Sequence, residues 1–144
     1  MTNGMDMIRA IREERAAPPS GIATLGLDRT HRWITALEPG HVELEWEVDD
    51  AHLNLEGAVI CPWTAALADQ ALFFASSSLC GEGEGTRMAD LHVRCLENMT
   101  GGTVTIDARI QRRVGNRMYG ICDFVTADGA LAAQTTAVID VIPS

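Results

Sequence analysis

Apolar residues dominate positions 58–80, where Asp69 is the one ionisable carboxylate. Pro62 stands near the start of this stretch, where a helix tolerates proline because first-turn N–H groups lack an acceptor anyway. Behind Pro62, apolar groups lie all round a helical wheel, which indicates a helix buried on every side. A membrane span is the alternative, but Asp69 at mid-segment and the serines at 76–78 disfavour it. We therefore predict a buried core helix, ended by the glycine-rich residues 81–85.

Alternation of apolar and polar residues on both sides of this helix predicts half-buried strands. Before the helix, apolar side chains alternate with glutamates, and after it the alternation recurs four times. Asp128-Gly129 is a strong signal for a tight hairpin, so the strands that flank it are antiparallel. The predicted strands cover residues 33–37, 42–48, 90–95, 103–110, 118–126 and 131–142.

The first twenty residues are predicted to form a helix and a connector within one domain of residues 1–144. The spacing of Met7, Ile8 and Ile11 favours a short amphipathic helix over residues 5–16, which the following prolines end. The length of the chain is typical of a single domain. No apolar signal segment opens the chain, so we expect a cytoplasmic protein.

Composition limits the class of partner. The net charge of −9 argues against nucleic-acid binding by bulk electrostatics. All 11 basic residues are arginine, so any phosphate contact would be made by arginine. Cys61, Cys80, Cys95 and Cys122 form no CxxC pair and have no histidine at metal-ligand spacing. We expect no metal site, and free, buried thiols in a reducing cytosol.

Asp69 needs an explanation of its own, because burying an unpaired carboxylate is costly. Such a group is paired, protonated or directed into a cavity. Two interpretations remain open: a structural Asp69 that is hydrogen-bonded to the backbone or to a serine, and a base or nucleophile at the wall of a pocket.

Several motifs carry a resemblance to a known family. Asn54 and Gly57 precede the helix, residues 67–75 read LADQALFFA, and residues 89–91 read ADL. With these motifs the chain resembles the hotdog-fold acyl-CoA thioesterases, and among them the phenylacetate-pathway enzyme. The resemblance implies an α+β fold in which an antiparallel sheet of about six strands wraps around one long central helix.

The resemblance also implies an activity, the hydrolysis of an acyl-CoA thioester to a free acid and coenzyme A. No cofactor is implied besides the coenzyme A of the substrate. Asp69 would activate water or attack the thioester carbon, the Cys61 backbone N–H would stabilise the oxyanion, and Asn54 would position the carbonyl or the water. The residues expected beside the substrate are Gly57, Ile60, Pro62, Thr86 and Met88.

The chain departs from the family at two places. Ile60-Cys61-Pro62 replaces the family's His-Gly-Gly, so Cys61 keeps a backbone N–H and Pro62 has none. Met88 stands where relatives often place a Ser or Thr that holds the attacking water, and Thr86 is the nearest hydroxyl. The first departure motivates a rival function, the binding of an acyl-CoA or an acyl carrier without hydrolysis. A dehydratase is disfavoured, because no paired Asp and His stand near the helix.

Other side chains have two interpretations each. Arg112, Arg113 and Arg117 flank one turn and would either hold the phosphates of coenzyme A or lie in solvent. His52 is expected to be an exposed loop residue, with a role as base less favoured. A nucleophilic Cys61 thiol is also less favoured, because no histidine is placed to be its base.

The last expectation concerns assembly. In the family, the Asn/Gly half and the Asp half of each site come from different subunits. The resemblance therefore implies a homodimer or homotetramer with sites at the subunit interface, and no membrane partner.

Overall fold

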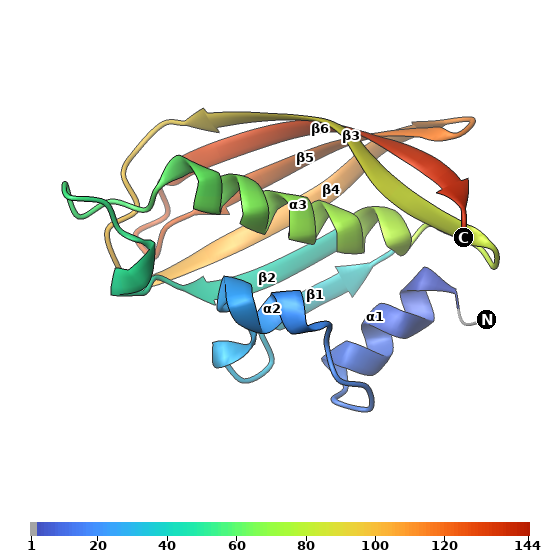
Figure 1. Cartoon of the computed structure of the whole chain (residues 1–144), viewed down its shortest axis with the longest axis horizontal. Coiled ribbons are helices and arrows are strands. Elements are labelled where there is room, and N and C mark those ends of the chain that lie inside the picture. Colours follow the sequence, from blue (N-terminus) through green and yellow to red (C-terminus); the bar gives the residue numbers. More distant parts are fainter. Residues whose placement is uncertain (1–2) are drawn as a thin grey trace.

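The computed structural model describes residues 3–144, which form one antiparallel sheet of six strands in the order β1-β2-β4-β5-β6-β3. The sheet curves around the long helix α3, and two short helices, α1 and α2, lie beside β1 and β2 (Figure 1). This arrangement confirms the predicted hotdog fold.

The helices are α1 (Gly4–Arg12), α2 (Ser20–Leu25) and α3 (Cys61–Ser77), with short 3-10 turns at Leu27–Arg29 and Asp50–His52. The strands are β1 (Ile34–Glu38), β2 (His41–Glu47), β3 (Glu84–Cys95), β4 (Thr103–Val114), β5 (Arg117–Val125) and β6 (Leu131–Pro143).

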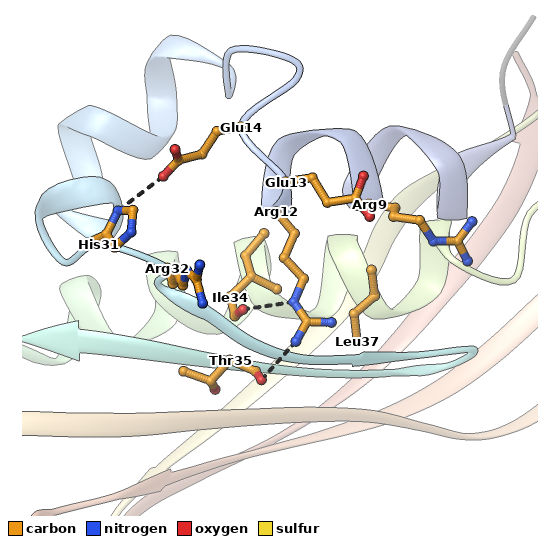
Figure 2. Close-up of a pocket in the computed structure, with 9 residues that line it drawn as sticks. All are labelled: Arg9, Arg12, Glu13, Glu14, His31, Arg32, Ile34, Thr35 and Leu37. Atoms are coloured by element: carbon orange, nitrogen blue, oxygen red, sulfur yellow. Dashed lines mark hydrogen bonds and ion pairs between the residues drawn. The ribbon is translucent and has the colours of Figure 1, made fainter.

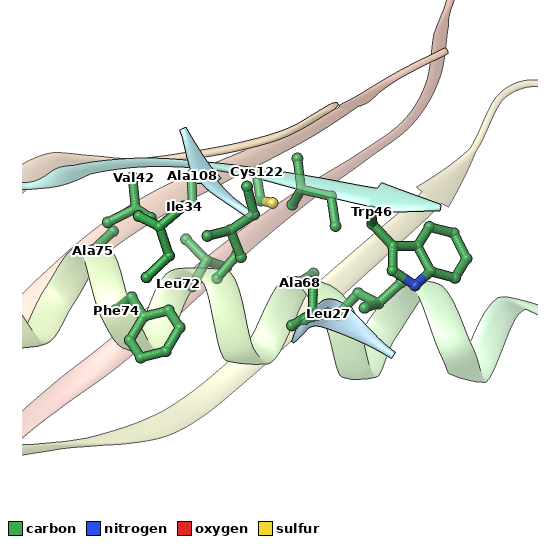
Figure 3. Close-up of a cluster of buried hydrophobic side chains, with 14 of the residues drawn as sticks. Leu27, Ile34, Val42, Trp46, Ala68, Leu72, Phe74, Ala75, Ala108 and Cys122 are labelled. Carbon is green, nitrogen blue, oxygen red and sulfur yellow. The ribbon is translucent and has the colours of Figure 1, made fainter. Parts of the chain in front are cut away.

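Helix α3 packs one face against the sheet and forms the centre of the core. The prediction of a helix buried on every side was wrong, because several of its residues are exposed in the chain: Cys61, Pro62, Asp69 and Phe73. The helix begins at Cys61 with Pro62 in its first turn, and Leu72 and Phe74 are fully buried (Figure 3). Burial of each such side chain contributes about 1.5–3 kcal/mol. The helix packs closely against β5, because a Cβ added to Gly120 would lie 2.8 Å from a methyl group of Leu72. Glycine at position 120 therefore lets the sheet approach the helix.

The two edges of the sheet differ in what covers them. At β1, the Arg12 guanidinium donates hydrogen bonds of 3.2 Å to each of the Ile34 and Thr35 carbonyls (Figure 2). At the opposite edge, β3 pairs with β6 on one side only, and within residues 3–144 no strand pairs with its other side. An unpaired edge of 12 residues is a ready template for another chain.

Predicted boundaries were wrong at the first helix and at β3, and one helix was missed. The first helix ends at Arg12 instead of residue 16, because the backbone turns left-handed at Glu14, with φ +58°. Helix α2 was not predicted, since its six residues are too few for a periodic pattern. Strand β3 begins at Glu84, within the glycine-rich stretch expected to be a loop. In the described part of the chain, no helix has the length and apolar character to span a bilayer.

Candidate active site

Helix α3 and strand β3 enclose a cleft of about 180 Å³ beside Asp69. Asp69, Phe73 and Ser76 follow one another at spacings of four and three residues, so they share a face of the helix. Thr86 and Met88 are two residues apart and therefore share a face of β3. The resemblance to the thioesterase family predicted Thr86 and Met88 to lie beside the substrate. The walls of the cleft are formed by Asp69, Phe73, Ser76, Thr86, Met88 and Ile139.

The Asp69 carboxylate has no hydrogen bond or ion pair among residues 3–144, so it is not the paired structural acid that was one of the two interpretations. The expectation that Asp69 is buried was wrong: it is exposed in the chain, because it lies on the open side of α3. It lies on the wall of the cleft, and partial loss of solvent there raises its pKa above its ordinary value. A carboxylate with a raised pKa and no partner is a stronger base than an ordinary aspartate.

Two hydroxyl groups share the cleft with Asp69. The Ser76 and Thr86 oxygens are 3.4 Å apart, and Ser76 donates to the Phe73 carbonyl at 3.1 Å. Ser76 is fully buried, yet it lines the cleft. Sequence reasoning missed Ser76; its spacing of seven residues from Asp69, which places both on one helix face, was the available signal.

The N-terminus of α3 carries the predicted oxyanion donor. Cys61 is the first residue of the helix, and the Trp63 and Thr64 N–H groups already donate to the Ile60 carbonyl, at 3.0 and 3.4 Å. Pro62 has no N–H, and the structure shows no acceptor for the Cys61 N–H among residues 3–144. The positive end of the helix dipole and a free N–H therefore coincide at Cys61. Ile60 and Pro62, predicted to line the site, are exposed on either side of it.

Asn54 and Gly57 shape the loop that leads into α3. The Asn54 side-chain oxygen accepts hydrogen bonds from the backbone N–H groups of Glu56, at 2.9 Å, and Ala58, at 3.2 Å. Gly57 has φ +74°, a left-handed conformation that favours glycine. Because its oxygen is engaged in this turn, Asn54 has only its amide NH₂ to offer to a ligand.

His52 is buried, so the expectation of an exposed loop residue was wrong. Its ring stacks on Trp63 with centroids 4.4 Å apart and lies 5.2 Å from the ring of Trp46. Burial lowers the pKa of His52, which favours the neutral ring. We interpret His52 as a packing residue that supports the first turn of α3.

The three arginines of the β4–β5 turn differ in their partners. Arg113 forms an ion pair of 2.9 Å with Glu84 and also donates to the Leu79 and Gly115 carbonyls. Arg117 pairs with Asp140 at 3.1 Å. Arg112 is exposed and has no ion pair within the part of the chain that the structure describes. These pairs favour a structural role for Arg113 and Arg117 and leave Arg112 available to a phosphate.

The expectation of buried thiols holds for only half of the cysteines. All four are free, and Cys80 and Cys122 are buried as expected. Cys61 and Cys95 are exposed, because each stands at the end of its element, where the core no longer covers it.

A larger cleft, of about 710 Å³, lies between α1 and β1 (Figure 2). Most of its charged side chains already have a partner in the chain. Glu14 pairs with His31 at 3.1 Å, and Arg12 donates hydrogen bonds to backbone carbonyls of β1. None of the predicted site residues lines it. The convergence of an unpaired acid with hydroxyl groups makes the smaller cleft the better candidate for chemistry.

The model of the thioesterase superfamily matches residues 56–133, more than half of the chain. The chain belongs to the thioesterase superfamily. The matched segment contains Asp69, Cys61, Thr86 and Met88, so it includes the N-terminus of α3 and all of the cleft's lining except Ile139. The resemblance predicted from the motifs is thus confirmed. A search of curated proteins finds no significant match.

Solved structures share this fold at low sequence identity. A phenylacetic acid degradation-related protein of Ralstonia eutropha is 24% identical, with a TM-score of 0.81 over 92% of this chain and 97% of that one. A thioesterase family protein of Silicibacter pomeroyi is 23% identical, with a TM-score of 0.80 over 95% and 98%. A Streptococcus mutans protein solved with bound acetyl-CoA is 22% identical, with a TM-score of 0.71 over 77% and 88%. These similarities show that the chain shares the fold of the three proteins.

Proposed function

We propose that this chain hydrolyses an acyl-CoA thioester and that Asp69 is its catalytic acid–base residue or nucleophile. The observation that carries the proposal is the unpaired Asp69 carboxylate on the wall of a cleft, with a raised pKa, in a member of the thioesterase superfamily. An acid in a cleft with a shifted pKa and no partner is a candidate for a functional role.

The proposed reaction uses groups that the cleft and the helix end provide. Asp69 accepts a proton from a water that attacks the thioester carbonyl, and the Thr86 hydroxyl helps to hold this water. The negative charge that develops on the carbonyl oxygen is stabilised by the Cys61 N–H. Collapse of the tetrahedral intermediate releases coenzyme A as the thiol and leaves the free acid.

One chain does not bring these groups together. Asp69 and Cys61 are eight residues apart on one helix, which corresponds to about 12 Å along its axis. Asp69 must act at the thioester carbon, and the Cys61 N–H must act at the oxygen bonded to that carbon. Two groups about 12 Å apart on one helix do not both reach the same carbonyl. We propose that Asp69 of one subunit works with the Cys61 N–H of a second copy, in a homodimer or homotetramer. The unpaired edge of β3, which carries Thr86 and Met88, is the surface on which a second copy would pair.

The acyl group would lie in the cleft against Phe73, Met88 and Ile139, three apolar side chains. Arg112 is the arginine left to contact the phosphates of coenzyme A. Binding of acetyl-CoA by the Streptococcus mutans relative supports this class of substrate.

The test is thiol release from a panel of short-chain, medium-chain and aromatic acyl-CoAs. We expect turnover by the wild-type protein and a loss of at least about 10²-fold in Asp69→Ala, because general acid–base catalysis contributes that much. Equal rates for both proteins, or no turnover of any acyl-CoA, would contradict the proposal.

The rival function is binding of an acyl-CoA or acyl carrier without hydrolysis, and Ile60-Cys61-Pro62 is the feature that favours it. Calorimetry that detects tight acyl-CoA binding without turnover would support the rival. The triple variant Ile60→His, Cys61→Gly, Pro62→Gly separates the two further. A silent wild type and an active triple variant would identify a thioesterase scaffold whose site is altered for binding.

A further inference from the structure

Two exposed thiols meet where the N-terminus of α3 lies against the end of β3. The Cys61 and Cys95 sulfur atoms are 3.4 Å apart, although the two residues are 34 positions apart in the sequence. A disulfide bond is about 2.05 Å long, so these sulfur atoms need to approach by little more than about 1 Å to form one. Both cysteines are exposed in the chain, and the proposed shared site must admit a thioester, so a small oxidant has the same route to Cys61.

The other two cysteines provide a contrast within the same chain. Cys80 is buried and its thiol donates to the Ser76 carbonyl at 3.6 Å. Cys122 is fully buried, and burial raises the pKa of its thiol far above the ordinary value. Burial raises the pKa of the Cys95 thiol too, so the contrast rests on access: a small oxidant reaches the exposed pair and does not reach the two buried thiols.

We propose that Cys61 and Cys95 are a redox modification site: a low-molecular-weight disulfide oxidises them to a reversible disulfide within one chain. In the first step, one cysteine attacks the disulfide, forms a mixed disulfide and releases one thiol. In the second step, the other cysteine displaces the second thiol and forms the Cys61–Cys95 bond. The two electrons and two protons that the cysteines lose are found on the two thiols released.

The position of the pair determines its effect. Cys61 carries the backbone N–H that the proposed function assigns to the oxyanion, so a covalent bond to Cys95 displaces the residue on which catalysis depends. A misplacement of about 1 Å at a catalytic group costs up to about 10²-fold in rate. We infer that oxidation switches the hydrolase off and that reduction restores it. This effect on rate rests on the proposed function; formation of the disulfide does not.

The experiment oxidises the native, assembled protein with oxidised glutathione, alkylates the remaining thiols after denaturation, and maps the peptides by mass spectrometry. We expect two alkylated thiols, Cys80 and Cys122, and one linked peptide pair that contains Cys61 and Cys95. Cys95→Ser should lose the linked pair and keep glutathione on Cys61, whereas Cys80→Ser, the matched control at a buried cysteine, should keep the linked pair. Four alkylated thiols, stable glutathione adducts on the wild type, or a bond between two chains would overturn the proposal.

A second arm measures thiol release before and after oxidation. Oxidised wild type should lose about tenfold or more of its rate and regain it with dithiothreitol, and Cys80→Ser, which keeps the linked pair, should do the same. A linked pair with an unchanged rate would overturn the switch. If no acyl-CoA is hydrolysed at all, the proposed function fails, and the peptide map still decides whether the disulfide forms.

Discussion

The Arg113 guanidinium forms a two-point ion pair with the Glu84 carboxylate, at 2.9 and 3.4 Å, and joins the β4–β5 turn to the start of β3. This pair holds the pKa of Glu84 below its ordinary value, because Arg113 donates to the ionised carboxylate. The neighbouring Arg112 has no such partner in the described chain. Two adjacent arginines therefore have different expected roles.

We predict that Arg112→Ala changes substrate binding, whereas Arg113→Ala changes stability. Arg112→Ala should raise KM for acyl-CoA about fivefold, with a weaker effect at high salt, and leave the melting temperature unchanged. Arg113→Ala should lower the melting temperature by a few degrees at most, because its ion pair is near the surface. Steady-state kinetics and thermal denaturation of both variants check this. A change of KM in Arg113→Ala alone would reverse the assignment.

Loss of the Cys61 N–H should be far more harmful than loss of its side chain. Cys61→Pro removes the N–H at the first helical position, where proline is tolerated, so the fold should survive. Turnover should fall by about 10²–10³-fold, as it does when one oxyanion donor is lost. Cys61→Gly keeps the donor and should keep or raise the rate, and Cys61→Ser should be mild. A large loss in both Cys61→Gly and Cys61→Ser would instead indicate a nucleophilic thiol.

A shared site predicts that two inactive variants restore each other. In a symmetric dimer, a subunit with Asp69→Asn and one with Cys61→Pro together form one site that carries both changes and one that is intact. Unfolding and refolding a one-to-one mixture should therefore recover about a quarter of the wild-type activity. Each variant refolded alone is the control. A mixture as inactive as its parts, or a wild-type monomer in light scattering at micromolar concentration, would contradict the shared site.

The pH dependence of the rate should reflect the raised pKa of Asp69. A general base must be ionised, so kcat/KM should fall as the pH drops through the pKa of Asp69. Because loss of solvent raises that pKa above its ordinary value of 3.8, the acid limb should lie at higher pH than for an exposed aspartate. A pH–rate profile with no acid limb above the ordinary value would contradict this role.

Local patterns predicted the helices and strands whose buried faces require apolar residues at regular spacing. The apolar run around Asp69 defined the central helix, and alternation defined the strands, because a half-buried strand requires it. Thr86 and Met88 were placed beside the substrate from their distance to the ADL motif. Both line the cleft with Asp69.

Features that depend on tertiary packing were missed. His52 stands in a polar stretch, and only the fold brings Trp46 and Trp63 to its two faces. Cys61 and Cys95 meet because α3 begins where β3 ends, which no local pattern encodes. The Ile139 side chain enters the cleft for the same reason, whereas Ser76 was missed although its helical spacing from Asp69 was a local signal.

The central claim is that Asp69 is retained for chemistry. The folded state raises the pKa of Asp69, so the folded protein binds this proton more tightly than the unfolded chain does. The stabilisation that protonation of this group provides is fully present below the unfolded pKa and is lost as the pH rises through the folded one. Because Asp69 is exposed in the chain, solvent screens this effect, and a neutral amide of the same shape should leave the melting temperature at pH 7 unchanged or slightly higher.

The most direct test is a paired measurement of turnover and melting temperature for Asp69→Asn at pH 7, with Asp28→Asn as a control outside the cleft. We predict that Asp69→Asn loses at least about 10²-fold in kcat with a melting temperature equal to or slightly above that of wild type, and that Asp28→Asn changes neither. An Asp69→Asn protein with unchanged turnover, or one that melts at a lower temperature than wild type, would show that Asp69 is a structural residue and would contradict the account.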